Sequence, residues 1–223
     1  MESLCGILTR FSFITERDSR LMSTIVVVKK AGRAVIAADS VTSFGNTQAN
    51  GKYLQNWGKI QPCGNSFVGI VGSSAHNNVL RSLVRNYPKL LSFNGLDDIF
   101  ETCRKLHPIL KDEYFINTSD DSEGPAYESS QIHTLVANQH GIFEIDTWRE
   151  IFAYERFWAL GSGRSFALGA MYAVYDQLDT PEQIAEIGVS AACEFDEGSG
   201  LPFTIHSIPL IKSRRGEKST RQT

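Results

Sequence analysis

Two hydroxyl-bearing residues directly follow a methionine near the start of this chain and open an apolar, strand-like run. Met22 precedes Ser23 and Thr24, residues 25–28 are β-branched and apolar, and a second apolar run ends at Asp39. If Ser23 is the first residue of the working chain, it carries both a hydroxyl nucleophile and a free α-amine. The amine can accept the proton of the hydroxyl, so this one residue can attack an amide carbonyl without a histidine base.

Two predicted strands position these groups. Residues 24–30 and 33–41 read as strands, and the Ala-Gly pair between them is typical of a tight turn, which predicts an antiparallel hairpin. Both runs are almost continuously apolar, which indicates a sheet covered on both faces. The hairpin places Asp39, at the end of its second strand, close to Ser23.

The rest of the chain alternates between groups of strands and pairs of helices. Polar composition predicts loops at 42–58 and 117–130, the second of them exposed. Period and turn signals predict strands at 66–72, 131–138, 141–147, 151–154 and 203–210, and helices at 74–87, 96–115, 165–175 and 180–195. This order predicts an α+β fold, a four-layer αββα sandwich, because each pair of helices can cover the outer face of one sheet.

Composition excludes several function classes. A chain of 223 residues fits one domain with a well-filled core. Its net charge of −3 is too small to favour a nucleic-acid partner, and no apolar run approaches the roughly 18 residues that would predict a membrane span. The four cysteines show neither a CxxC pair nor a zinc-binding spacing, so we expect reduced thiols in a cytoplasmic protein.

The domain organisation is expected to have three parts. Residues 1–22 are interrupted by charges and do not resemble a signal peptide, so we interpret them as a propeptide or as a stretch upstream of a misassigned start. The second interpretation is favoured because an initiator methionine such as Met22 is normally removed before a small residue. Residues 23–211 form one domain, and 212–223 form a basic, flexible tail.

Five short motifs occur in a fixed order along the chain. They are Ser-Thr-Ile-Val at 23–26, Val-Ile-Ala-Ala-Asp-Ser at 35–40, Gly-Lys-Ile at 58–60, Gly-Ser-Gly at 161–163 and Asp-Glu-Gly-Ser-Gly at 196–200. In order and spacing they resemble proteasome β subunits and HslV-type peptidases of the N-terminal nucleophile hydrolases, nearest to a bacterial proteasome homologue. The resemblance runs from Ser23 to about Leu210 and implies the same αββα sandwich.

The resemblance implies a nucleophile and its two partners. Ser23 falls where the family has its catalytic threonine, Asp39 where it has a buried aspartate, and Lys59 where it has the lysine beside the hydroxyl. A buried ammonium can lower the pKa of the hydroxyl, while the carboxylate holds the lysine in place. Serine keeps the hydroxyl but loses the methyl group that restricts its rotamer, which is expected to affect rate more than mechanism.

Each of these assignments has a plainer alternative. Ser23 could be a strand-edge serine, Asp39 a turn cap and Lys59 a surface lysine. Lys52 competes with Lys59, because the loop after Asp39 is a few residues longer than is usual in the family. Lys59 is preferred because it leads directly into the following strand-forming segment.

The resemblance also implies groups that orient the amine and stabilise the oxyanion. Ser162 corresponds to a serine that hydrogen-bonds the terminal amine, and Asp196 and Ser199 to an Asp-x-x-Ser pair with the same orienting role. The oxyanion hole is expected at a backbone N–H near Ser73, before a helix N-terminus, with Gly72 as the adjacent alternative.

Three residues are expected near the substrate. By resemblance, Val71 and Ala75 fall near the first specificity pocket, and Thr42 falls among the substrate-binding residues. Val71 and Ala75 are uncharged and apolar, which favours an apolar or small side chain on the acyl side of the cut. The alternative, that both are core residues, is equally compatible with the sequence.

No metal and no cofactor is predicted. The five histidines lie in different predicted elements without a metal-ligand spacing. A different N-terminal nucleophile, Cys5, is disfavoured because it does not follow an initiator methionine and no comparable strand pattern follows it.

Together these observations predict an endopeptidase subunit that uses Ser23 and its own α-amine. By resemblance, the subunits would assemble as homo-oligomeric stacked rings, act on polypeptides and work with an AAA+ unfoldase. A non-catalytic ring-forming subunit and an amidase or acylase acting on a small amide are the alternatives.

Overall fold

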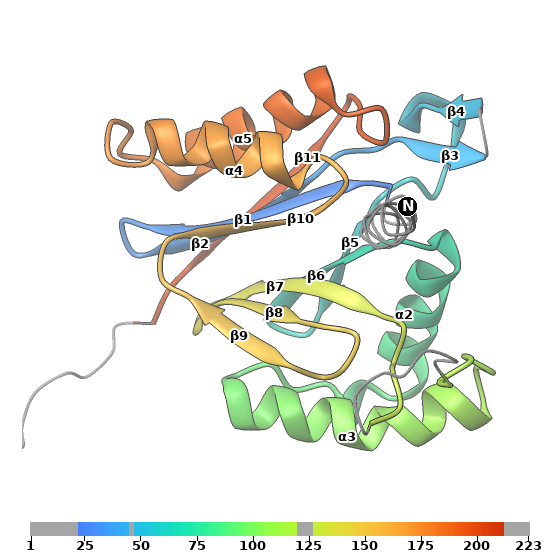
Figure 1. Ribbon diagram of the computed structural model, residues 1–223. Helices are drawn as coiled ribbons and strands as arrows, with labels where there is room; N and C mark the ends of the chain where they lie inside the picture. The colour runs from blue at the N-terminus through green and yellow to red at the C-terminus, as the bar shows by residue number, and fades with distance from the viewer. Residues whose placement is uncertain (1–21, 45–46, 120–126, 212–223) are drawn as a thin grey trace, which may run out of the picture.

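The computed structural model describes residues 22–44, 47–119 and 127–211, and in it two β-sheets lie face to face between two pairs of helices (Figure 1). The predicted α+β fold class and αββα sandwich are therefore confirmed. The predicted tail at 212–223 and residues 1–21 of the predicted leader lie outside the described residues. Within the described parts, no helix is both long and apolar enough to cross a membrane.

The first sheet has the order β10-β1-β2-β11, and all of its neighbours are antiparallel. Its strands are β1 (Thr24–Lys30), β2 (Arg33–Ala38), β10 (Phe157–Gly161) and β11 (Thr204–Pro209). The turn between β1 and β2 has positive φ angles at Ala31 and Gly32, which suits the right-handed twist of a two-residue hairpin. The hairpin predicted from the sequence is therefore present.

The second sheet packs against the inner face of the first. It has the order β5-β6-β7-β8-β9, with strands β5 (Ile60–Cys63), β6 (Ser66–Val71), β7 (His133–Asn138), β8 (Gly141–Ile145) and β9 (Ile151–Tyr154). Ile25 and Ile36 of the first sheet join Leu135 and Ile142 of the second in one buried cluster. A Cβ at Gly69 would lie 3.0 Å from two side-chain atoms of Ile25, so glycine allows the sheets to approach closely here.

Each outer face is covered by two helices (Figure 1). Helices α4 (Arg164–Val174) and α5 (Pro181–Phe195) cover the first sheet, and their buried side chains pack with alternate residues of β1 and β2. Helices α2 (Ser74–Asn86) and α3 (Leu96–Asp112) cover the second sheet, and the short 3-10 turn η2 (Pro88–Leu90) connects them.

The region expected to be a single loop at 42–58 contains regular structure. It forms a small hairpin of β3 (Thr42–Phe44) and β4 (Thr47–Ala49), followed by the 3-10 turn η1 (Gly51–Tyr53). The hairpin was not predicted because the segment is polar and lacks the apolar alternation of a strand. Hydrogen bonds from the side chains of Gln48 and Asn50 to backbone carbonyls of the segment before β11 stabilise this region. Strands β5 and β10 were also not predicted.

The loop predicted to be exposed at 117–130 is exposed at Asn117, Ser119, Tyr127 and Glu128 but buried at three other described positions. Thr118 is 4% exposed, Ser129 2% and Ser130 8%. The Ser129 amide donates to the Thr118 carbonyl, and the Ser130 amide donates to the Thr147 carbonyl. Backbone hydrogen bonds therefore satisfy these polar residues inside the fold, and the prediction of exposure was wrong at these positions.

Removing side-chain volume between the sheets tests this packing. Because Ile36 is 0% exposed, Ile36→Ala should lower the free energy of unfolding by about 2–5 kcal/mol. Ile205→Ala in the neighbouring strand is the control, because Ile205 is already 37% exposed and should cost less. Urea denaturation followed by circular dichroism measures both, and equal losses would contradict the assigned core.

Candidate active site

Strand alternation at the start of β1 sends Ser23 and Thr24 in opposite directions. Ile25 and Val27 pack between the sheets, whereas Val26 packs under α4 and α5. Thr24 points to the helical side with Val26, where it is 0% exposed and its Oγ1 lies 2.7 Å from Ser199 Oγ. Ser23 is on the other face and lines a cleft. Of the two hydroxyls, the one that faces the cleft belongs to Ser23.

The loop after β10 packs directly against the backbone at Ser23. Gly161 has φ +99°, and a Cβ there would lie 1.9 Å from the Ser23 carbonyl oxygen. A Cβ at Gly163 would lie 2.3 Å from Thr24 Oγ1. Only glycine fits at these two positions, so the Gly-Ser-Gly motif is needed for the close approach of β10 to the start of β1.

The Asp39 carboxylate lies at the centre of a dense set of donors. Its Oδ1 accepts from the Thr24 amide at 2.8 Å and from Lys59 Nζ at 2.6 Å. Its Oδ2 accepts from the Val41 amide at 2.9 Å and from the Gly200 amide at 3.2 Å. Asp39 is fully buried, so these donors replace the water that a buried carboxylate loses.

Lys59 comes from the segment just before β5 and is also buried, with 7% of its side chain exposed. Burial lowers the pKa of the Lys59 ammonium below its usual value, and the Asp39 carboxylate opposes part of that shift. Lys59 lines the same cleft as Ser23. Lys52, the competing candidate, is exposed, is not among the described lining residues, and places its ammonium over the Tyr53 ring.

A second network joins the two remaining motifs to the start of β1. Asp196 Oδ2 accepts from Ser162 Oγ at 2.7 Å and from Ser199 Oγ at 2.6 Å. Ser162 Oγ in turn accepts from the Ser23 backbone nitrogen at 3.4 Å. The loops before α4 and after α5 thus meet at the nitrogen of Ser23. The structure brings together all six residues expected to be catalytic, Ser23, Asp39, Lys59, Ser162, Asp196 and Ser199.

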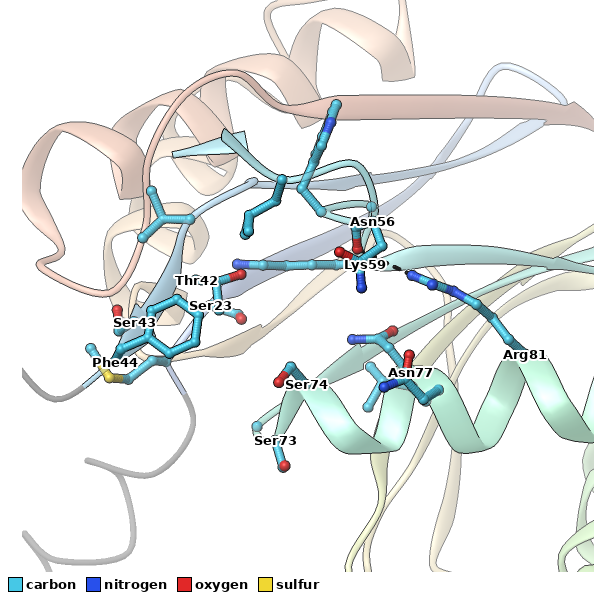
Figure 2. A pocket seen from close by; sticks show the side chains of 18 residues that line it. Ser23, Thr42, Ser43, Phe44, Asn56, Lys59, Ser73, Ser74, Asn77 and Arg81 are labelled. Atoms are coloured by element: carbon cyan, nitrogen blue, oxygen red, sulfur yellow. Dashed lines mark hydrogen bonds between the residues drawn. The ribbon is translucent and has the colours of Figure 1, made fainter. Parts of the chain in front are cut away.

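The cleft has a volume of about 370 Å³ and opens at the end of the sandwich where β1 begins. Strand β3 forms one wall, the segment 54–59 forms another, and the first turns of α2 form the third (Figure 2). Thr42, expected to be substrate-binding, lines the β3 wall together with Ser43 and Phe44.

The first turn of α2 presents backbone donors to this cleft. Gly72, Ser73 and Ser74 line it, and Ser73 is the N-cap residue, with its Oγ accepting from the Ala75 amide at 3.3 Å. The backbone N–H of Ser73 has no hydrogen-bond partner among the described residues. An unpaired N–H at the positive end of a helix is suited to stabilise negative charge.

Two residues expected at the specificity pocket do not line the cleft. Val71 is 2% exposed and packs between the sheets with Leu135 and Ile25, as the alternative core interpretation allowed. Ala75 is exposed and is not among the described lining residues. The α2 side chains that do line the cleft beyond its first turn are polar: Asn77, Asn78 and Arg81. Sequence reasoning missed them, although Asn77 and Arg81 show the i, i+4 spacing of one helix face.

One group outside the cleft has the composition of a metal site. His133, Glu144 and Asp146 have ligand atoms within 4.8 Å of one another. His133 Nε2 lies 2.7 Å from Glu144 Oε1, and the Tyr154 hydroxyl donates to the other oxygen of Glu144. His133 begins β7, Glu144 lies in the adjacent strand β8, and Asp146 directly follows β8, so only sheet pairing brings the histidine to the two carboxylates. These internal contacts already satisfy the buried carboxylate.

Known proteins resemble this chain in both sequence and fold. The ATP-dependent protease subunit HslV of Bartonella quintana is 26% identical over 189 residues, which cover 83% of this chain and 89% of that protein. The eukaryotic HslV of Trypanosoma brucei, at 19% identity and a TM-score of 0.63 over 83% of this chain and 99% of that one, shares the fold. No model of a known protein family matches the chain.

Two solved structures are more similar. Thiobacillus denitrificans BPH in complex with Epoxomicin is 34% identical, with a TM-score of 0.77, and the match covers 85% of this chain and 100% of that one. A second structure of Thiobacillus denitrificans BPH is 36% identical, with the same TM-score, over 84% of this chain and 98% of that one. The resemblance inferred from the sequence motifs is therefore confirmed, and the chain belongs to the HslV-type proteasome β family of N-terminal nucleophile hydrolases.

Proposed function

We propose that this protein is a proteasome-like peptidase subunit in which Ser23 is the nucleophile and its α-amine is the base. The observation that carries the proposal is the position of Ser23. Its side chain lines the cleft beside Lys59, and its backbone nitrogen lies 3.4 Å from Ser162 Oγ. The nucleophile, the base and the group that orients the base, Ser162, are therefore next to one another.

Acylation would proceed as follows. The α-amine takes the proton of the Ser23 hydroxyl, and the oxygen attacks the carbonyl carbon of the peptide bond. The N–H groups at Ser73 and Gly72 stabilise the negative oxygen of the tetrahedral intermediate. The ammonium then gives its proton to the leaving nitrogen, the C–N bond breaks, and an ester to Ser23 remains.

Deacylation uses the same groups in reverse. The free amine removes a proton from a water molecule, and the water oxygen attacks the ester carbonyl. The ammonium then returns its proton to Ser23 Oγ as the ester C–O bond breaks, and the carboxylic acid product leaves. Lys59 lowers the pKa of the Ser23 hydroxyl through its positive charge, and Asp39 fixes Lys59 in place. Ser162 and Asp196 hold the amine so that its lone pair faces the hydroxyl.

This mechanism requires that no residue precede Ser23. When Met22 is attached, the nitrogen of Ser23 is part of a peptide bond and cannot act as a base. Met22 itself lines the cleft, where it occupies space that a substrate would use. Removal of the residues before Ser23 therefore both creates the base and opens the site.

We further propose assembly into rings, with an ATPase as partner. The name of the Bartonella quintana relative describes that protein as a subunit of an ATP-dependent protease. The outer face of α4 and α5 supports assembly, because it exposes large apolar side chains: Phe166 at 44%, Tyr172 at 75%, Ile187 at 37% and Phe195 at 68%. Exposed apolar patches of this kind mark protein–protein interfaces. A cytoplasmic location would suit such an assembly.

The N-terminus of the natively expressed protein is the first test. Intact mass under denaturing conditions should correspond to a chain that begins at Ser23, and native mass spectrometry of the same sample should show a multimer. A protein that keeps Met22 would lack the base and would be a precursor or a non-catalytic ring subunit. A monomer with a free Ser23 would favour an amidase or acylase acting on small amides.

Substitution separates the two neighbouring hydroxyls. Ser23→Ala should lower kcat/KM on peptide substrates by about 1,000-fold or more, because it removes the nucleophile. Thr24→Val, the matched control, removes only the contact to Ser199 and should cost less than about 10-fold, as expected for one lost hydrogen bond. The N-terminal residue of every variant is checked by mass. The opposite ranking of the two variants would assign the nucleophile to Thr24.

The pH dependence of kcat/KM tests the roles of the amine and Lys59. The rate should rise as the α-amine loses its proton, at a pKa of about 8. As the pH rises further, the rate should fall again, because the Lys59 ammonium loses its proton. The midpoint of this fall should lie below pH 10.5, the usual pKa of lysine, because burial lowers the pKa of Lys59. Lys59→Arg should remove the falling limb, since guanidinium stays charged, and Lys52→Arg should not. A wild-type profile that shows no fall up to pH 10.5 while the protein remains folded would contradict a rate that depends on a Lys59 ammonium of lowered pKa.

A further inference from the structure

The charges around the cleft are unbalanced. Its described lining residues include the cations Lys59 and Arg81 but no carboxylate. The positive charge of Lys59 is balanced by the Asp39 carboxylate in their ion pair. Arg81 forms no ion pair with any described residue, and one of its terminal nitrogens donates to the Asn56 carbonyl at 3.1 Å. Because guanidinium is charged at every accessible pH and carries five N–H donors, Arg81 brings an uncompensated positive charge and unused donors to the cleft.

Asn77 adds a second polar group that lacks a partner. It lies one helical turn before Arg81, and both side chains project from α2 toward the segment that carries Asn56 and Lys59 (Figure 2). Asn77 Oδ1 is buried and has no hydrogen-bond partner among the described residues. Buried polar atoms are normally paired, so this amide is available to a ligand, and by rotation it can present either its oxygen or its NH₂ group.

The start of α2 contributes in the same sense. Its first turn lines the cleft and contains no acidic residue, so the positive end of the helix is not compensated. The helix end, the Arg81 guanidinium and the unpaired Asn77 amide lie along one wall, opposite Thr42 and Ser23. An anionic side chain could accept hydrogen bonds from the guanidinium and the amide, and the positive helix end would favour its charge, whereas a cationic side chain would be repelled.

We propose that this cleft selects peptides with an acidic side chain on the acyl side of the bond to be cut, and that Arg81 is the specificity-determining residue. Asn77 assists as a second hydrogen-bonding group. The inference rests on the proposed peptidase function for its substrate class. It replaces the apolar preference expected from Val71 and Ala75, which do not line the cleft. A planar carboxylate can take two parallel N–H bonds from the Arg81 guanidinium, a geometry that a neutral amide cannot reproduce.

Hydrolysis of matched peptides tests the preference. Four fluorogenic peptides differ only in the residue on the acyl side of the cut, which is glutamate, glutamine, leucine or lysine. Wild-type protein should cleave the glutamate peptide with a kcat/KM about 10- to 100-fold above that of the glutamine peptide, with the lysine peptide cleaved most slowly. Arg81→Met should abolish this advantage, because it removes the guanidinium and keeps the apolar stem.

Two further variants control for indirect effects. Arg81→Lys keeps the charge but loses the bidentate geometry, so it should retain part of the preference. Arg85→Met removes a cation one turn further along α2 at an exposed position that is not among the described lining residues, and it should leave the preference unchanged. Equal cleavage of the glutamate and glutamine peptides by wild type, or an equal loss in Arg85→Met, would overturn the inference.

A binding measurement keeps the inference testable without catalysis. Fluorescence polarisation with the Ser23→Ala variant compares the Kd of labelled peptides that end in glutamate or glutamine. Tighter binding of the glutamate peptide, lost in the Ser23→Ala, Arg81→Met double variant, would support a pocket for acidic side chains. If wild type nevertheless hydrolyses no peptide, only the proposed peptidase function is refuted. If all four fluorogenic peptides are hydrolysed but the glutamate and glutamine peptides bind with equal Kd values, the pocket for acidic side chains is refuted and the peptidase function is not.

Discussion

The buried carboxylate of Asp39 is the constraint on which the rest of the site depends. An isolated carboxylate in the interior would cost several kcal/mol, so it must be surrounded by donors. The donors come from separate parts of the chain: the start of β1 at Thr24, the residue Val41, the segment before β5 at Lys59, and the loop before β11 at Gly200. These segments therefore meet at one end of the sandwich, and the cleft forms where they meet.

A second constraint is how closely the loop after β10 approaches β1. Gly161 and Gly163 have no side chains because the Ser23 carbonyl and the Thr24 hydroxyl occupy that space. This contact holds Ser162 beside the Ser23 nitrogen, while Asp196 ties Ser162 and Ser199 together from the end of α5. The charged Asp39–Lys59 pair and this hydroxyl network thus approach the same residue from opposite sides. In the proposed mechanism, the first acts on the hydroxyl of Ser23, and the second acts on its nitrogen.

The polarity of the cleft follows from how α2 is placed. Its apolar residue Leu80 is buried against the second sheet and Leu83 against α3, so the opposite stripe faces away from that core. At the start of the helix this stripe meets the cleft, which is why Asn77 and Arg81 line it. On an ordinary surface helix this stripe would face solvent. Here it forms a wall of the cleft, because β3 and the segment 54–59 lie opposite it. Charge on this stripe then acts on a ligand instead of on water.

The sequence by itself determined the parts of this protein that depend on local pattern. Strand alternation and the tight turn predicted β1 and β2, helical spacing predicted the four main helices, and five ordered motifs identified the family. The same motifs singled out six residues, and the structure places these six around the start of β1. These predictions succeeded because apolar period and turn chemistry act over a few residues, and because Asp39 is carried back to Ser23 by a hairpin whose register the turn fixes.

Other features of the site and its surroundings depend on contacts between distant segments and were visible only in the tertiary structure. The β3–β4 hairpin is held by side chains bonded to a distant loop, Val71 is turned into the core by the pairing of β6, and His133 meets two carboxylates only across neighbouring strands. The same holds for Arg81, whose charge matters because no described carboxylate stands opposite it. These contacts join segments that are far apart in the sequence, so the local sequence around each residue does not predict them.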